Sequence, residues 1–140
     1  MKKKDKAIRY FRDGYNCSQS VLLACAGENT NTVKAAAAFG GGMGRLQKTC
    51  GAVTGAYIYF GMQFGAPGLP KETDKMRVYD KVKEFNRLFI ERNGTELCSE
   101  LLGQDLNSHE GRARIKELDL HTKVCEKCVA DAIDIIDLLD

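Results

Sequence analysis

Residues 40–61 read GGGMGRLQKTCGAVTGAYIYFG and join a glycine-rich loop to the most apolar segment of the chain. The stretch holds seven glycines and a single cysteine, Cys50, and it lacks acidic residues. From Cys50 to about Gln63 nearly every position is apolar, which predicts a helix that is buried on all sides. A helix of about 14 residues is too short to cross a membrane, so we expect it at the centre of a helical bundle.

Gly51 and Gly55 lie four residues apart at the start of this helix, so one of its faces carries almost no side chain. A second helix or a cofactor could approach the backbone closely at that face. Gly51 and Gly55 are therefore candidate cofactor-binding positions. The alternative is a tight crossing of two helices beside a flexible connection.

The rest of the chain has the pattern of further helices separated by glycines and turns. Apolar residues recur at spacings of three and four, and no segment shows the sustained alternation of a strand. Thr32 and Thr49 are the expected N-caps of a short helix over residues 33–39 and of the apolar helix. The sequence predicts an all-α protein, with a single domain over residues 1–140 and about six or seven helices around the central apolar helix.

The composition excludes several classes of protein. Of the 140 residues, 44% are apolar and 29% are charged, and the formal net charge of +2 is too small to predict nucleic-acid binding. No apolar run has the length of a membrane span, and the start of the chain lacks the apolar segment of a signal peptide. We therefore expect a cytoplasmic protein without a nucleic-acid or membrane partner. The apolar helix and its tyrosines would also suit a homodimer interface.

Six cysteines occur in the chain, at positions 17, 25, 50, 98, 125 and 128. In a reducing compartment, this number favours redox chemistry or metal binding over structural disulfides. Four of them are expected in the first turns of separate helices: Cys17, Cys50, Cys98 and Cys125. The free N–H groups and the positive dipole at a helix start favour a thiolate. Four such positions predict that these helix ends converge on a common centre.

Cys125 and Cys128 form a C-x-x-C pair on one face of the last expected helix. This pair fits a redox couple, half of a metal site, or two ordinary buried thiols. Cys25 falls on the apolar side of its helix, where a cysteine packs as a small hydrophobic residue. His109 and His121 stand in polar surroundings and are expected to be solvated rather than to bind a metal.

Taken together, the spaced motifs resemble a family of small redox-active proteins labelled C_GCAxxG_C_C. The resemblance covers most of the chain, and it lies in residues 16–19, 41–44 and 50–55, in Cys98 with residues 101–103, and in Cys125. It implies that Cys17, Cys50, Cys98 and Cys125 are the four cysteines of the family, with Cys25 and Cys128 in addition. It implies redox activity but no particular substrate.

Three functions fit these cysteines. In the first, Cys50 attacks a disulfide and Cys125 with Cys128 forms the resolving pair, while Cys17 and Cys98 complete the catalytic set. In the second, Cys17, Cys50, Cys98 and Cys125 are the ligands of an iron–sulfur cluster or a zinc ion. In the third, the cysteines are buried and inert, and the protein is a structural or interaction module. The sequence identifies no redox partner and leaves open whether the protein is an enzyme.

Overall fold

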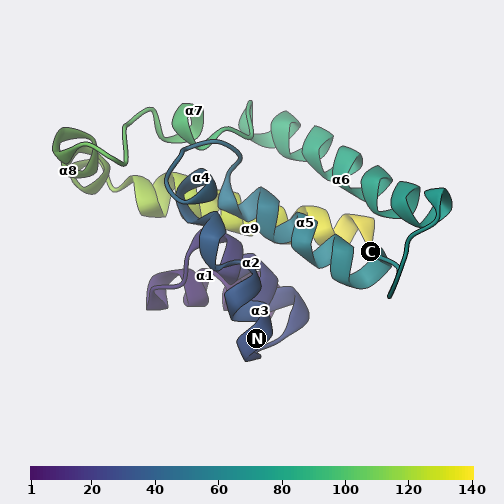
Figure 1. Cartoon of the computed structure of the whole chain (residues 1–140). Coiled ribbons are helices and arrows are strands. Elements are labelled where there is room, and N and C mark those ends of the chain that lie inside the picture. The colour runs from purple at the N-terminus through teal and green to yellow at the C-terminus, as the bar shows by residue number, and fades with distance from the viewer.

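The apolar helix α5, Gly51–Phe64, lies at the centre of the computed structural model, which describes all residues from 1 to 140 (Figure 1). Residues 51–56, at the N-terminus of α5, are all buried. Helices α2 (Cys17–Ala26), α6 (Glu72–Asn93) and α9 (Glu126–Leu139) pack around it. The predictions of an all-α fold and of a central apolar helix are therefore confirmed.

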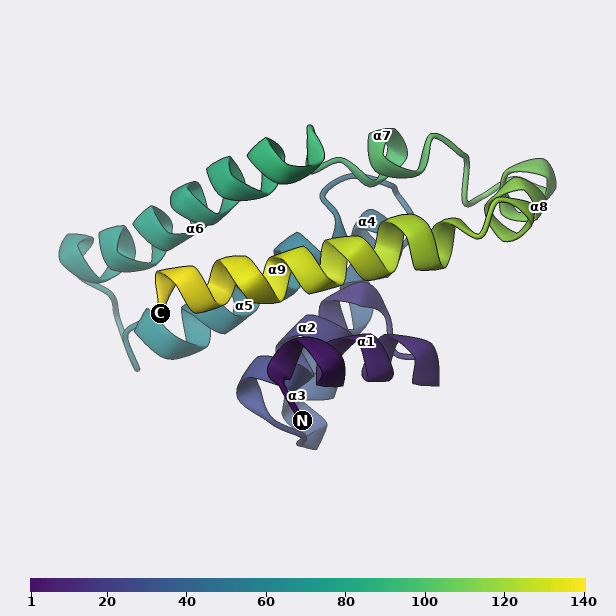
Figure 2. The same ribbon diagram turned by 180° about the vertical axis from the view of Figure 1, so that it is seen from behind.

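The helices are stacked so that α5 and α9 lie between α6 on one side and α1 to α3 on the other (Figures 1 and 2). Helix α9 contacts α1, α5 and α6 and so ties the stack together. The first helices are α1, Lys3–Asp13, and α3, Thr30–Ala35. The shorter elements are η1 (Ala37–Phe39), α4 (Gly40–Met43), α7 (Cys98–Leu102), α8 (His109–Glu117) and η2 (His121–Cys125). No helix combines the length and the apolar character that a membrane span requires.

The third helix starts earlier than the sequence predicted. Asn29, rather than Thr32, is its N-cap, because the Asn29 side chain accepts a hydrogen bond from the Thr32 N–H at 2.8 Å. The helix ends at Ala35, and residues 37–39 form a 3₁₀ turn instead of extending it. The run of alanines carries no signal for this break.

The central helix also begins differently. Cys50 is itself the N-cap residue, because the preceding Thr49 is drawn into an isolated antiparallel bridge with Leu97. Two short backbone hydrogen bonds flank this bridge, from Cys50 N to the Glu96 carbonyl and from Cys98 N to the Lys48 carbonyl, both 2.7 Å. The start of α5 is thereby tied to the segment that leads into α7.

Aromatic packing joins the far half of α5 to α6. Phe60, Phe85 and Phe89 are fully buried. The ring centroids of Phe60 and Phe85 are 5.9 Å apart, and those of Phe85 and Phe89 are 6.0 Å apart. Burying one such ring contributes roughly 1.5–3 kcal/mol to folding. The hydrophobic core thus holds the distant part of α5, while its N-terminus stays available for other contacts.

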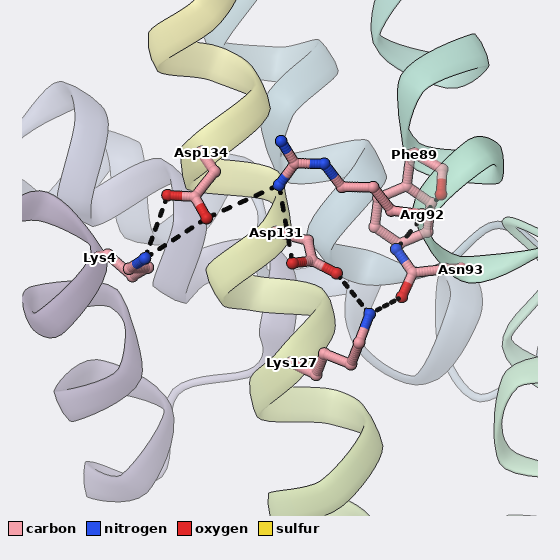
Figure 3. Close-up of polar contacts among 7 residues, drawn as sticks. All are labelled: Lys4, Phe89, Arg92, Asn93, Lys127, Asp131 and Asp134. Carbon is pink, nitrogen blue, oxygen red and sulfur yellow. Dashed lines mark hydrogen bonds and ion pairs between the residues drawn. The ribbon is translucent and has the colours of Figure 1, made fainter.

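A network of polar contacts holds α1 and α6 against α9 (Figure 3). Arg92 of α6 lies 3.8 Å from Asp131 and 3.7 Å from Asp134, and Lys4 of α1 lies 3.2 Å from Asp134. Lys127 bridges Asp131 (2.7 Å) and the side-chain oxygen of Asn93 (2.8 Å). Each exposed pair contributes little alone, but together they fix the orientation of α9 between its neighbours.

The crossing of α2 and α5 generates a stability prediction. A Cβ atom at Gly55 would lie 2.6 Å from the Ser18 carbonyl oxygen, whereas a Cβ at Gly61 in the same helix meets nothing within 4 Å. We expect Gly55→Ala to lower the free energy of unfolding by about 1–3 kcal/mol, because the two helices must separate. Gly61→Ala is the matched control and should raise it by up to about 1 kcal/mol through helix propensity. Urea unfolding followed by circular dichroism measures both, and equal effects would contradict the close crossing.

Candidate functional site

A cavity of about 880 Å³ opens at the end of the bundle where α2, α5, α7 and α9 begin. Five of the six cysteines line it: Cys17, Cys50, Cys98, Cys125 and Cys128. They come from parts of the chain that are more than 100 residues apart in sequence. Cys25 does not line this cavity and packs against the hydrophobic core.

Cys17 is placed by the N-cap of α2. The Asn16 side chain accepts a hydrogen bond from Gln19 N at 2.8 Å, and the Gln19 side chain accepts one from Asn16 N at 3.1 Å. The Asn16 amide also donates to the Ala37 carbonyl at 3.2 Å. On the other side is Gly51, where a Cβ would lie 3.0 Å from the Cys17 Cβ. Helix α2, at Cys17, therefore approaches α5 closely at this glycine.

The glycine-rich loop before α5 forms a left-handed turn. Five consecutive residues, Gly41 to Arg45, have φ between 58° and 69°. Within α4, Gly41 and Gly42 therefore do not have right-handed helical geometry. Left-handed geometry costs other residues roughly 1–2 kcal/mol each, so Met43 and Arg45 are strained while the glycines are not. The sequence identified the glycines but gave no signal for Met43 or Arg45.

This loop packs directly on Cys98. A Cβ at Gly42 would lie 2.7 Å from the Cys98 Cβ, so only glycine fits there. The buried Gln47 side chain donates to the Gln104 carbonyl (2.8 Å) and accepts from Leu106 N (2.9 Å). The loop is therefore pinned to the segment that follows α7, and Cys98 is held between them.

Four of the thiols at the cavity lie close enough to shift one another's pKa values. The strongest influences link Cys17 with Cys125 and Cys50 with Cys128, and all four are free thiols. Cys17 and Cys125 are partly exposed, whereas Cys50 is 7% exposed and Cys128 is 1% exposed. We therefore call Cys17 and Cys125 the outer pair, and Cys50 and Cys128 the inner pair.

In each pair, the pKa of one thiol is lowered and the pKa of the other is raised. Hydrogen bonding from Cys17 lowers the pKa of Cys125 to about 6, with a further contribution from His121. The pKa of Cys17 is correspondingly raised. Hydrogen bonding from Cys128 lowers the pKa of Cys50, and the N–H groups of Ala52 and Val53 at the start of α5 lower it as well. The pKa of Cys128 is raised.

Cys98 differs from the paired cysteines. Burial raises its pKa to about 12, although it is the first residue of α7. A position at a helix start is therefore not sufficient to produce a thiolate in this protein, because desolvation outweighs it at Cys98. Cys25 behaves in the same way, since burial raises its pKa to about 12.

His121 belongs to the site, although the sequence suggested only a solvated histidine. It begins the π-helical turn η2, in which the Glu126 N–H donates to the His121 carbonyl. The hydrogen bond with Cys125 raises the pKa of His121. The spacing of four residues between His121 and Cys125 is the signal that could have found this contact, and π-turns often occur at functional sites. His109 does not line the cavity.

No group of three or more His, Cys, Asp or Glu side chains is arranged so that it could hold a metal ion. The ligand set Cys17, Cys50, Cys98 and Cys125 therefore stays a prediction from the sequence.

Comparison with known proteins gives one match. Residues 15–139 match the family described as "Putative redox-active protein (C_GCAxxG_C_C)". The match covers all six cysteines and the whole cavity lining except Phe11, Arg12 and Gly14. No curated protein and no solved structure matches the chain.

The acidity of Cys125 leads to a measurable pH dependence. Because its pKa is lowered to about 6, the thiolate is present above that pH and is lost as the pH falls through it. Alkylation of Cys125 by iodoacetamide should therefore be half-maximal near this pH, instead of near the value of about 8.5 for an ordinary thiol. Mass spectrometry of the Cys125 peptide between pH 5 and 9 measures the profile.

Two variants of Cys17 test the cause of this acidity. Cys17→Ala removes the hydrogen-bond donor and should move the alkylation profile of Cys125 to higher pH. Cys17→Ser keeps a hydroxyl donor and should move it less. A profile centred near that of an ordinary thiol in the unmodified protein, and unchanged in both variants, would refute the assigned contact.

Proposed function

Because this chain belongs to the C_GCAxxG_C_C family of redox-active proteins, we propose that it is a thiol–disulfide redox protein with two cooperating dithiol pairs. The outer pair is Cys17 with Cys125, and the inner pair is Cys50 with Cys128. Each pair cycles between two thiols and one disulfide. The protein therefore takes up two electrons per pair.

The observation that carries this proposal is the gathering of five cysteines at one cavity, where Cys17 and Cys125 are partly exposed and Cys50 and Cys128 are buried. Thiol–disulfide exchange needs a thiolate to attack and a second thiol to resolve the mixed disulfide. Cys125 has the lowered pKa and partial exposure that suit the attacking group. Its neighbour Cys17 remains protonated and suits the resolving role.

The outer reaction balances as two successive exchanges. The Cys125 thiolate attacks one sulfur of a substrate disulfide, forms a mixed disulfide, and releases the first substrate thiolate. Cys17 then attacks the Cys125 sulfur, gives its proton to the released thiolate, and displaces the second substrate thiolate. The substrate disulfide is reduced to a thiol and a thiolate, and Cys17 and Cys125 are oxidised to a disulfide.

The inner pair can accept that disulfide by exchange, without a further oxidant. The Cys50 thiolate lies close enough for its charge to act on Cys17. Its attack on the Cys17 sulfur releases the Cys125 thiolate and forms a bond between Cys17 and Cys50. Cys128 then attacks Cys50, transfers its proton to Cys17, and completes the inner disulfide. The outer pair returns to its reduced form.

This scheme differs from the sequence hypothesis in its pairing. The sequence favoured Cys50 as the first nucleophile and Cys125 with Cys128 as one resolving pair. The exposure of the thiols favours Cys125 as the external nucleophile, because Cys125 is partly exposed whereas Cys50 is buried. Cys98 remains a thiol in this scheme.

Disulfide mapping tests the proposed pairing. Oxidation of the reduced protein with diamide should produce two disulfides, Cys17–Cys125 and Cys50–Cys128, and leave Cys25 and Cys98 open to alkylation. Trypsin cleaves after Lys127 and so places Cys125 and Cys128 on different peptides. Mass spectrometry of the linked peptides, with fragmentation to separate Cys17 from Cys25, identifies each bond.

The control for this experiment is Cys25→Ser, which should leave both disulfides unchanged. Cys50→Ser should abolish the inner bond and preserve the outer one. A dominant disulfide between Cys125 and Cys128, or resistance of all six thiols to diamide, would refute the proposal. So would stoichiometric iron or zinc in protein purified without oxygen, since these thiols would then serve as ligands.

A further inference from the structure

Apart from its thiols, the cavity has a charged lining that is mostly positive. Its charged lining consists of Arg12, Arg45, Arg112 and Glu126, together with the titratable His121. Arg12 and Glu126 neutralise each other through two hydrogen bonds of 3.0 and 2.9 Å. Neither Arg45 nor Arg112 has a carboxylate within 4.0 Å. Two arginines of the lining therefore have no carboxylate partner in the protein.

These two arginines are held by different parts of the fold. Arg45 ends the left-handed turn, and its carbonyl accepts a hydrogen bond of 2.7 Å from the Asn107 side chain. Its positive charge acts on His121 and opposes protonation of that ring, which by itself lowers the His121 pKa. Arg112 belongs to α8, and one of its guanidinium nitrogens donates to the Leu106 carbonyl at 3.1 Å. The remaining N–H groups of both side chains are free to bind an anion.

The strained position of Arg45 supports a role in binding. The backbone of Arg45 has a φ of 63°, a conformation that glycine or asparagine adopts more readily than arginine. Backbone strain of this kind persists where the surrounding structure enforces it, and it is common in ligand-binding segments. The hydrogen bonds of the loop to the region after α7 provide that enforcement here.

The dimensions of the cavity favour a small ligand. A volume of about 880 Å³ falls within the range of sites for small molecules, which is roughly 300–1,000 Å³. The inner thiols are buried, and the outer ones are only partly exposed. A disulfide on the surface of a folded protein would have to enter this recess, whereas a free small molecule can do so without rearrangement.

We propose that the disulfide reduced at Cys125 belongs to a low-molecular-weight compound with carboxylate groups, which Arg45 and Arg112 bind. This inference rests on the thiol–disulfide function proposed above and specifies its substrate class. Guanidinium groups suit the purpose because they bind carboxylates through two parallel hydrogen bonds. The same charges also raise the local concentration of anions at the cavity.

Three disulfides that differ in charge test this inference. The dianion 3,3′-dithiodipropionate, the neutral bis(2-hydroxyethyl) disulfide and the dication cystamine are each mixed with the reduced full-length protein. The readout is the rate at which Cys125 becomes resistant to alkylation. Each rate is divided by the rate of the same disulfide with 2-mercaptoethanol, which removes differences in intrinsic reactivity.

We expect the dianion to react at least about tenfold faster than the neutral disulfide after this correction, and cystamine to react more slowly than either. The advantage of the dianion should shrink between about 0.01 M and about 1 M salt, as the Debye length falls from about 30 to about 3 Å. Equal corrected rates would overturn the inference but not the proposed function. Failure of all three disulfides to oxidise Cys125 would overturn both.

Charge substitutions provide the matched controls. The double variant Arg45→Gln/Arg112→Gln should lose most of the rate advantage of the dianion over the neutral disulfide, and an unchanged circular dichroism spectrum checks that it is still folded. Arg77→Gln removes the same kind of charge from α6, outside the cavity lining, and should keep the preference. An unchanged preference in the double variant would contradict binding by these two arginines.

Discussion

The close crossing of α2 and α5 is the constraint on which both the bundle and the candidate site depend. At Gly51 and Gly55 the backbone of α5 meets Cys17 and Ser18 without an intervening side chain. The N-termini of the two helices are thereby brought to the same end of the molecule. Any side chain at these positions would separate the helices and, with them, cysteines that lie far apart in the sequence. The same contact therefore supports the central packing and brings Cys17 against the start of α5, next to Cys50 in the sequence.

The left-handed turn of Gly41–Arg45 closes the site from the opposite side. The residues that follow the turn, Gln47 and Lys48, hydrogen-bond to the start of α7 and to the segment after it, and the turn itself packs on Cys98 through Gly42. Residues in strained conformations are retained where the surrounding structure determines them, and here that structure is a cavity wall. The same turn carries Arg45, so its strained backbone also determines where a positively charged side chain begins. The glycines flanking Cys50 thus serve two purposes, which are helix approach in α5 and left-handed geometry in the loop.

Much of the fold could be predicted from local patterns. The uniformly apolar helix had to be central, and cysteines expected at helix starts indicated one centre. What could not be predicted depends on contacts between distant segments. No local pattern pairs Cys17 with Cys125 or Cys50 with Cys128, since the i, i+3 spacing favoured Cys125 with Cys128 instead. The exposed His121 reads as solvated until the π-turn places it beside Cys125.

The acidity of the cysteines shows why helix starts alone are an incomplete guide. The N–H groups at the start of α5 help to lower the pKa of Cys50, as expected for a cysteine at a helix N-terminus. Cys98 also stands at a helix start, yet burial raises its pKa. Cys125 lies inside continuous helical structure, because η2 precedes α9, and a neighbouring thiol and an imidazole acidify it instead. A partner that supplies a hydrogen bond therefore decides which thiol is acidified, and that partner exists only once the helices have assembled. The acidity of a thiol in this protein is a property of the folded bundle rather than of any cysteine motif.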